Sequence, residues 1–164
     1  MSRWRPPQPK SSPYITENGY RTLEAELRAL WSKRTGVTQA LSAAAAEGDR
    51  SENAEYIYRK KELREIDRRI LFLQRRLPSL NIIAAIPDDT SKIYFGAWVT
   101  LEDEEGVELR YRIVGADEID PKKSYISLDS PLAKILLKKS IDDEVSITIN
   151  NIHSRYFIVD IRYE

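Results

Sequence analysis

Residues 46–56 read AEGDRSENAEY, a short polar stretch between two long segments with helical hydrophobic periodicity. The first segment repeats apolar residues in alternating steps of three and four, with Arg34 filling one place: Tyr20, Leu23, Leu27, Leu30, Val37, Leu41 and Ala44. The second segment repeats the spacing at Leu63, Ile66, Ile70, Leu73, Leu77 and Leu80. This spacing is typical of coiled-coil helices. Because the polar stretch is so short, the two helices must lie antiparallel, with EGDRSEN at the far end of a helical hairpin.

Several residues indicate where these helices begin, weaken and end. Thr16 is an N-cap candidate for the first helix. Gly36 lies inside that helix, where it costs about 1 kcal/mol relative to alanine and marks a place for a bend. Pro78 predicts that the second helix stops or kinks near Leu77. Arms of about 25 residues would give a rod of roughly 35–40 Å.

From Ala97 onward the pattern changes to the alternation of β-strands. AWVTLED and VELRYRIVG flank a turn at Glu104–Gly106 and predict a β-hairpin. Further strands are predicted at SYISLD, EVSITIN and SRYFIVDIRY, and Ser130-Pro131 opens a short helix, PLAKILLKK. We therefore predict an α+β protein with a flexible tail (residues 1–13), a coiled-coil hairpin domain (14–85) and a domain with a small antiparallel sheet and one helix (86–164).

Composition excludes several classes of protein. The 164 residues carry 26 basic and 26 acidic side chains, so no global charge indicates a nucleic-acid binder. The absence of cysteine excludes disulfides and thiolate metal sites and fits a reducing compartment. No stretch approaches the roughly 20 apolar residues of a membrane span, and the basic, proline-rich tail lacks the apolar core of a signal peptide. We expect a cytoplasmic monomer that does not enter a membrane.

Asp49 and Glu52 have two interpretations. Acids at this spacing before a helix form a capping box, in which Asp49 caps the first amides and Glu52 reaches back. Alternatively, the two carboxylates share a face and provide half of a Mg²⁺ site, because Mg²⁺ is commonly held by one or two carboxylates together with substrate phosphates and water. The other half would come from a second macromolecule. A zinc site is excluded, since the only histidine is His153.

The second helix concentrates positive charge. Residues 59–76 hold eight basic and three acidic side chains, a net charge of +5. This excess favours an anionic ligand such as single-stranded nucleic acid, on which Tyr56 and Tyr58 would stack if they are not packing residues. The alternative is a solvated helix face with i,i+4 ion pairs such as Glu65–Arg69.

Long stretches of the chain resemble the Gre transcript-cleavage factors of bacterial RNA polymerase, in particular the GreB subgroup. They are GDRSENAEY with YRKKELREIDRRI, FGAWVTLEDEEGVELRYRIVGADEI, and YISLDSP with LAKILLKK. The resemblance covers about residues 14–164. It implies a coiled coil that enters the secondary channel of RNA polymerase, and a C-terminal domain of FKBP-like fold that docks at the channel rim.

The resemblance also implies roles for individual residues. Asp49 and Glu52 would help to hold a Mg²⁺ ion shared with the polymerase and position the attacking water, so that the polymerase itself cleaves backtracked RNA. Ser51 and Asn53 match the surrounding motif and would orient ligands or water. The 3′ end of the RNA would lie near a basic face made of Arg59, Lys60, Lys61, Arg64 and Arg68. Asp129, Ser130 and Pro131 match the loop that contacts the polymerase, although they also suit a plain strand-to-helix connection.

One departure bears on the mechanism. The first arm, LWSKRTGVTQALSAAAAEGD, is about one residue shorter than in the subgroup. A deletion in a helix rotates every residue beyond it by about 100° and breaks the heptad register unless Gly36 absorbs it. Two alternatives to a cleavage-stimulating factor therefore stay open: a regulator that occupies the channel without supporting cleavage, and a coiled-coil adaptor whose tip acids only cap a helix. The intact acid pair favours the first function.

Overall fold

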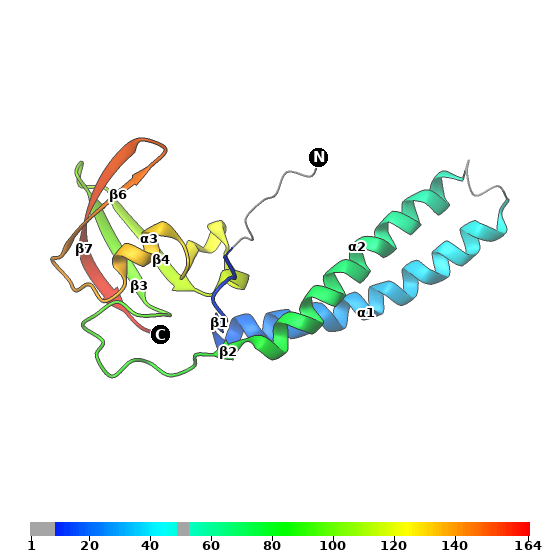
Figure 1. Cartoon of the computed structure of the whole chain (residues 1–164), viewed down its shortest axis with the longest axis horizontal. Coiled ribbons are helices and arrows are strands. Elements are labelled where there is room, and N and C mark those ends of the chain that lie inside the picture. Colours follow the sequence, from blue (N-terminus) through cyan, green and yellow to red (C-terminus); the bar gives the residue numbers. More distant parts are fainter. Residues whose placement is uncertain (1–8, 49–52) are drawn as a thin grey trace. The chain divides into compact units, whose positions relative to one another are not determined.

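The computed structural model describes residues 9–48 and 53–164 (Figure 1). The chain forms two compact units: residues 20–80 make up the hairpin unit, and the segment up to Gly19 joins Asn81–Glu164 in the sheet unit. The predicted hairpin range of 14–85 therefore includes at both ends a few residues that group with the sheet unit. Within the described ranges no helix is long and apolar enough to cross a membrane.

The hairpin unit is built from helix α1 (Glu17–Ala46) and helix α2 (Ala54–Arg76), which lie antiparallel (Figure 1). The heptad pattern correctly predicts the buried seam, in which Val37, Ile66 and Ile70 form a core flanked by Leu27, Leu30 and Leu63. Thr16 caps α1 as predicted, because its hydroxyl accepts a hydrogen bond from the Gly19 amide at 3.0 Å. Helix α2 gives way to a 3₁₀ turn, η1 (Leu77–Ser79), at Pro78, also as predicted.

Ion pairs also join the two arms. Arg34 takes a seam position, where its Nε donates to Asp67 of α2 at 2.6 Å. This hydrogen bond raises the pKa of Arg34 above its ordinary value. Arg69 makes a bidentate pair with Glu26 at 2.6 and 3.0 Å. These side chains are partly exposed, so solvent screens both pairs and each adds little to stability.

Helix α1 runs without interruption through Gly36. Nothing lies within 4 Å of the place that a Cβ would occupy at Gly36. Replacing Gly36 with alanine is therefore expected to raise the free energy of unfolding by about 1 kcal/mol, because alanine loses less backbone entropy in a helix. Urea unfolding followed by circular dichroism measures this change, and a decrease would mean that the glycine is required.

The sheet unit contains a five-stranded sheet in the order β5-β4-β3-β7-β6. Its strands are β3 (Trp98–Asp103), β4 (Glu108–Val114), β5 (Tyr125–Ser127), β6 (Glu144–Ile149) and β7 (Ile152–Arg162). The predicted hairpin and the last two strands are confirmed, with Gly106 (φ 81°) in the first turn and Asn150 and Asn151 in the last. The prediction of a wholly antiparallel sheet is wrong. The sheet is mixed, because β5 pairs with β4 in parallel. The connection from β4 to β5 contains two 3₁₀ turns, η2 (Ala116–Glu118) and η3 (Pro121–Lys123).

Helix α3 (Pro131–Leu136) packs its buried residues Ala133 and Leu136 into the core of the sheet with Val99, Leu101, Ile113 and Ile158. A second, two-stranded sheet pairs β1 (Tyr14–Ile15) with β2 (Asn81–Ile82) in parallel. The sequence predicts a flexible tail over residues 1–13. In the described part of this segment, however, Ser12 and Pro13 form hydrogen bonds with Asp129 and Asn81. An α+β fold with two helices followed by a sheet and a further helix is confirmed.

Candidate functional site

The tip of the hairpin lies between Ala46, where α1 ends, and Ala54, where α2 begins. Gly48 has φ of 132°, a conformation that L-residues with a side chain rarely adopt, so the chain leaves α1 through a position suited to glycine. Asp49, Ser51 and Glu52, which the sequence predicts as site residues, lie outside the described residues. The structure describes the residues on either side of them, the end of α1 with Gly48 and the start of α2 with Asn53, which together are called the frame of the tip.

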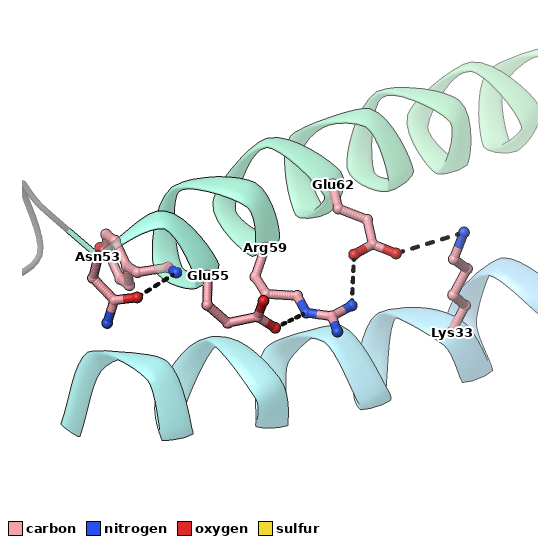
Figure 2. A network of polar contacts seen from close by, with 6 residues as sticks. Lys33, Asn53, Glu55, Arg59 and Glu62 are labelled. Carbon is pink, nitrogen blue, oxygen red and sulfur yellow. Dashed lines mark hydrogen bonds and ion pairs between the residues drawn. The ribbon is translucent and has the colours of Figure 1, made fainter. Parts of the chain in front are cut away.

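Asn53 joins the two helices by two hydrogen bonds, of which Figure 2 shows the one at the start of α2. Its Oδ1 accepts a hydrogen bond from the Tyr56 amide at 3.1 Å, which makes Asn53 the N-cap of α2. Its Nδ2 donates to the carbonyl of Ala44, near the end of α1, at 2.7 Å. The N-cap of α2 is thus Asn53, while Asp49 and Glu52, for which the sequence left a capping box open, lie outside the described residues. The preference of asparagine for N-caps was the signal in the sequence that pointed to it.

Replacing Asn53 with alanine removes both of these bonds. We expect the free energy of unfolding to fall by about 1–2 kcal/mol, which is the usual cost of losing an N-cap. Aspartate at this position should restore the cap, because its carboxylate accepts from Tyr56, but not the bond to Ala44, because it has no N–H to donate. Chemical denaturation of the two variants separates these contributions. Equal stability of Asn53→Ala and the unaltered chain would contradict this assignment.

Arg59 is held by acidic neighbours near the tip (Figure 2). Its Nε donates to Glu55 at 2.8 Å and a terminal nitrogen donates to Glu62 at 3.0 Å. Lys33 of α1 lies 3.7 Å from the other oxygen of Glu62. The hydrogen bonds with Glu55 and Glu62 raise the pKa of Arg59 above its ordinary value. Of the five residues predicted to bind RNA, Arg59 is thus committed to contacts within the hairpin.

The other four, Lys60, Lys61, Arg64 and Arg68, are all exposed on α2. Lys60, Arg64 and Arg68 follow one another at steps of four, so they form a stripe on the side of the helix away from the buried Ile66 and Ile70. The ammonium group of Lys60 lies 5.8 Å from the centre of the Tyr56 ring, a cation–π distance. Within the described part of the chain, Lys61, Arg64 and Arg68 form no ion pair. This face can therefore offer its charge to an anionic ligand.

The predicted docking turn, Asp129–Pro131, connects β5 to α3 in the sheet unit. The Ser130 hydroxyl accepts from the Ala133 amide at 3.2 Å and caps α3, with Pro131 in its first turn. The Asp129 amide donates to the Ser127 hydroxyl at 3.0 Å, and the Asp129 carboxylate accepts two hydrogen bonds from Ser12. The sequence therefore correctly predicts the serine cap, whereas nothing in it indicates the partnership with Ser12.

Among the described residues no group of three or more His, Cys, Asp or Glu side chains lies close enough to hold a metal ion. The candidate ligands Asp49 and Glu52 fall outside those residues.

Comparisons with known proteins agree along the chain. Residues 13–82 match the family model for the transcription elongation factor N-terminal domain, and residues 88–163 match the transcription elongation factor GreA/GreB C-terminal model. Transcription elongation factor GreB of Pseudomonas aeruginosa is 54% identical over 99% of this chain and 98% of its own length. Its counterpart from Xanthomonas axonopodis pv. citri is 52% identical with the same coverage.

Among solved structures, GreA factor homologue 1 (Gfh1) of Thermus thermophilus is 24% identical, covers 91% of this chain and 97% of its own, and superposes with a TM-score of 0.42. The two family models together span most of the chain, and relatives above 50% identity match it from end to end. The chain belongs to the GreA/GreB family of transcription elongation factors.

Proposed function

We propose that this chain binds bacterial RNA polymerase, enters its secondary channel with the hairpin tip, and stimulates cleavage of backtracked nascent RNA by the polymerase's own active site. It acts as an activator and is not itself the enzyme. Family membership over nearly the whole chain supports this function. The observation that carries it is the Asp49–Glu52 acid pair in the sequence between two antiparallel helices, the second of which has Asn53 as its N-cap.

The chemical contribution of the chain is small and specific. Asp49 and Glu52 supply two carboxylates, the kind of ligand with which proteins usually hold Mg²⁺ beside substrate phosphates and water. When bound, Mg²⁺ lowers the pKa of a coordinated water and stabilises the charge that develops on the phosphate. The polymerase supplies the remaining ligands, so this chain alone is expected to hold no metal tightly. Ser51 and Asn53 support the acids from neighbouring positions, and Asn53 does so by fixing the start of α2 to the end of α1.

Two further surfaces assist this reaction. The exposed stripe on α2 lies within a few helical turns of the tip, so its cations would hold phosphates of the RNA 3′ end. We assign Lys60, Lys61, Arg64 and Arg68 to this contact and give Arg59 a structural part, because two carboxylates already engage it. The Asp129–Pro131 turn of the sheet unit docks on the polymerase outside the channel.

The test is RNA cleavage in a stalled, backtracked elongation complex with Mg²⁺. RNA labelled at its 5′ end should shorten much faster when the protein is added, with the polymerase alone as the control. Competition for the channel without faster shortening would instead indicate a regulator that occupies the channel without supporting cleavage. If the protein neither binds the polymerase nor accelerates cleavage, the proposal is overturned.

A further inference from the structure

Cationic and aromatic side chains alternate across three neighbouring strands of the sheet unit. In the register of the sheet, Trp98 of β3 lies opposite Arg112 of β4, and Arg112 lies opposite Tyr125 of β5. Arg110 lies two residues before Arg112 on β4, so its side chain is on the same face. Lys123, at the end of η3, completes the series. We call these five residues the Trp98 cluster.

Each cation of the Trp98 cluster lies near an aromatic ring. The guanidinium carbon of Arg110 is 4.3 Å from the centre of the Trp98 ring, and that of Arg112 is 5.9 Å from Trp98 and 5.7 Å from Tyr125. The Lys123 ammonium group is 5.9 Å from the centre of the Tyr125 ring. These are cation–π distances. The Trp98 indole nitrogen is buried and has no acceptor in the described part of the chain, so this residue contributes through its ring.

The cluster lies on the face of the sheet opposite to the hydrophobic core. Val99 and Ile113, the neighbours of Trp98 and Arg112 along their strands, are fully buried in that core. Successive side chains of a strand point to opposite faces, so the cluster points away from the core. Arg110 is exposed, and Arg112 and Trp98 are half-buried. A ligand can therefore reach this surface.

The three cations of the cluster are not neutralised by acidic neighbours. Among the residues that the structure describes, no carboxylate pairs with Arg110, Arg112 or Lys123. Arg112 donates to uncharged groups, the Gly96 carbonyl at 3.2 Å and the Tyr125 hydroxyl at 3.5 Å. Because like charges held close together repel one another, an anion that binds among them is favoured.

Acidic side chains confine this positive charge to one part of the face. Glu102 of β3 and Glu108 of β4 lie opposite each other, beside the turn that joins these strands. Asp160 of β7 pairs with Arg162 at 2.7 Å. An anionic ligand is therefore expected over β4 and β5, away from the turn.

We propose that the Trp98 cluster binds single-stranded RNA, with phosphates on its cations and a base stacked beside them. The donor fork of arginine fits phosphate, and bases stack on guanidinium planes as well as on aromatic rings. Surfaces that bind single strands combine these two kinds of side chain. An acidic protein segment would satisfy the charge but would make no use of the stacking surfaces. The inference goes beyond the proposed function, which assigns RNA to the stripe on α2.

Fluorescence anisotropy of a short, labelled oligouridylate tests this site in the full-length chain. Lys60 and Arg64 are replaced with alanine in every sample, so that the stripe on α2 contributes little. In this background Arg110→Ala/Arg112→Ala should weaken RNA binding by about tenfold. The slope of log affinity against log salt concentration should fall by about 1.4, because each phosphate contact on a single strand contributes about 0.7.

Two further variants separate the cluster from general charge. Arg155→Ala is the matched control, since Arg155 is another exposed arginine of the same sheet but is engaged by Glu104 and Glu144. It should bind RNA within about twofold of the background chain. Trp98→Leu keeps every cation, so it should weaken binding severalfold through lost stacking while the salt slope stays unchanged. Melting temperatures establish that each variant is folded.

The inference is overturned if the background chain binds no RNA, or if Arg110→Ala/Arg112→Ala binds no more weakly than Arg155→Ala. Normal RNA binding by the arginine double variant, with weaker binding to RNA polymerase, would instead assign the cluster to an acidic protein segment. These results are independent of the cleavage test. Binding of free RNA by the cluster is measured without polymerase, so either proposal can fail while the other stands.

Discussion

Replacing Asp49 and Glu52 together with alanine should abolish the stimulated cleavage of backtracked RNA while polymerase binding stays within about threefold. In the proposed function the two carboxylates supply the metal ligands, whereas binding would depend on the docking turn and the arms of the hairpin. Metal stabilisation of a phosphoryl transition state amounts to several kcal/mol, so cleavage should slow by about a thousandfold. Single-turnover cleavage of labelled RNA at saturating protein measures the rate without the influence of affinity.

Two controls separate metal ligation from other roles of the acids. Glu47→Ala removes another exposed acid from the same tip and should leave the rate nearly unchanged, because Glu47 is not part of the acid pair. The double variant should also keep the melting temperature of the unaltered chain, since α2 is capped by Asn53. A large loss of stability in the double variant, with binding lost as well, would return the acids to a structural role. Equal loss of cleavage in Glu47→Ala would point to the total negative charge of the tip.

The parts of the fold that depend on local periodicity could be predicted from the sequence. The heptad spacing predicts the seam around Val37, Ile66 and Ile70, since a three-four repeat leaves only one stripe to bury. The alternation of apolar and polar residues predicts strands β3, β4, β6 and β7, because every second side chain of a strand lies on the same face of the sheet. The parallel pairing of β5 with β4 could not be predicted, because it depends on the path of the chain through two 3₁₀ turns and not on the residues of the strand.

The candidate site divides in a similar way. The stripe on α2 is evident from the spacing of Lys60, Arg64 and Arg68, whereas the commitment of Arg59 depends on the rotamers of Glu55 and Glu62. The contact of Ser12 with Asp129 joins segments 117 residues apart and leaves no periodic trace in the sequence. The sequence analysis did not identify Asn53 as the cap of α2, because the start of the helix at Ala54 is not evident from the spacing of its apolar residues.

Gly115 should tolerate alanine worse than any glycine in the hairpin. Its φ of −70° and ψ of 161° suit any residue, so the reason is space and not backbone conformation. A Cβ at this position would lie 2.1 Å from the carbonyl oxygen of Tyr14 and 3.1 Å from Glu118 Oε2. The first atom belongs to the backbone of β1, which cannot rotate away like the end of a flexible side chain.

The response to Gly115→Ala therefore depends on which group must move. Shifting the Tyr14 carbonyl displaces β1, whose next residue, Ile15, is completely buried and pairs with β2. Shifting Glu118 instead disturbs the carboxylate that accepts from the amides of Thr16 at 3.0 Å and Gly115 at 2.8 Å. We expect a loss of about 2–3 kcal/mol in the free energy of unfolding, in the range of overpacked sites. Urea unfolding beside Gly36→Ala makes the comparison direct, because the same added methyl group should stabilise the open site and destabilise the crowded one; equal effects at both would mean that β1 can move away at little cost.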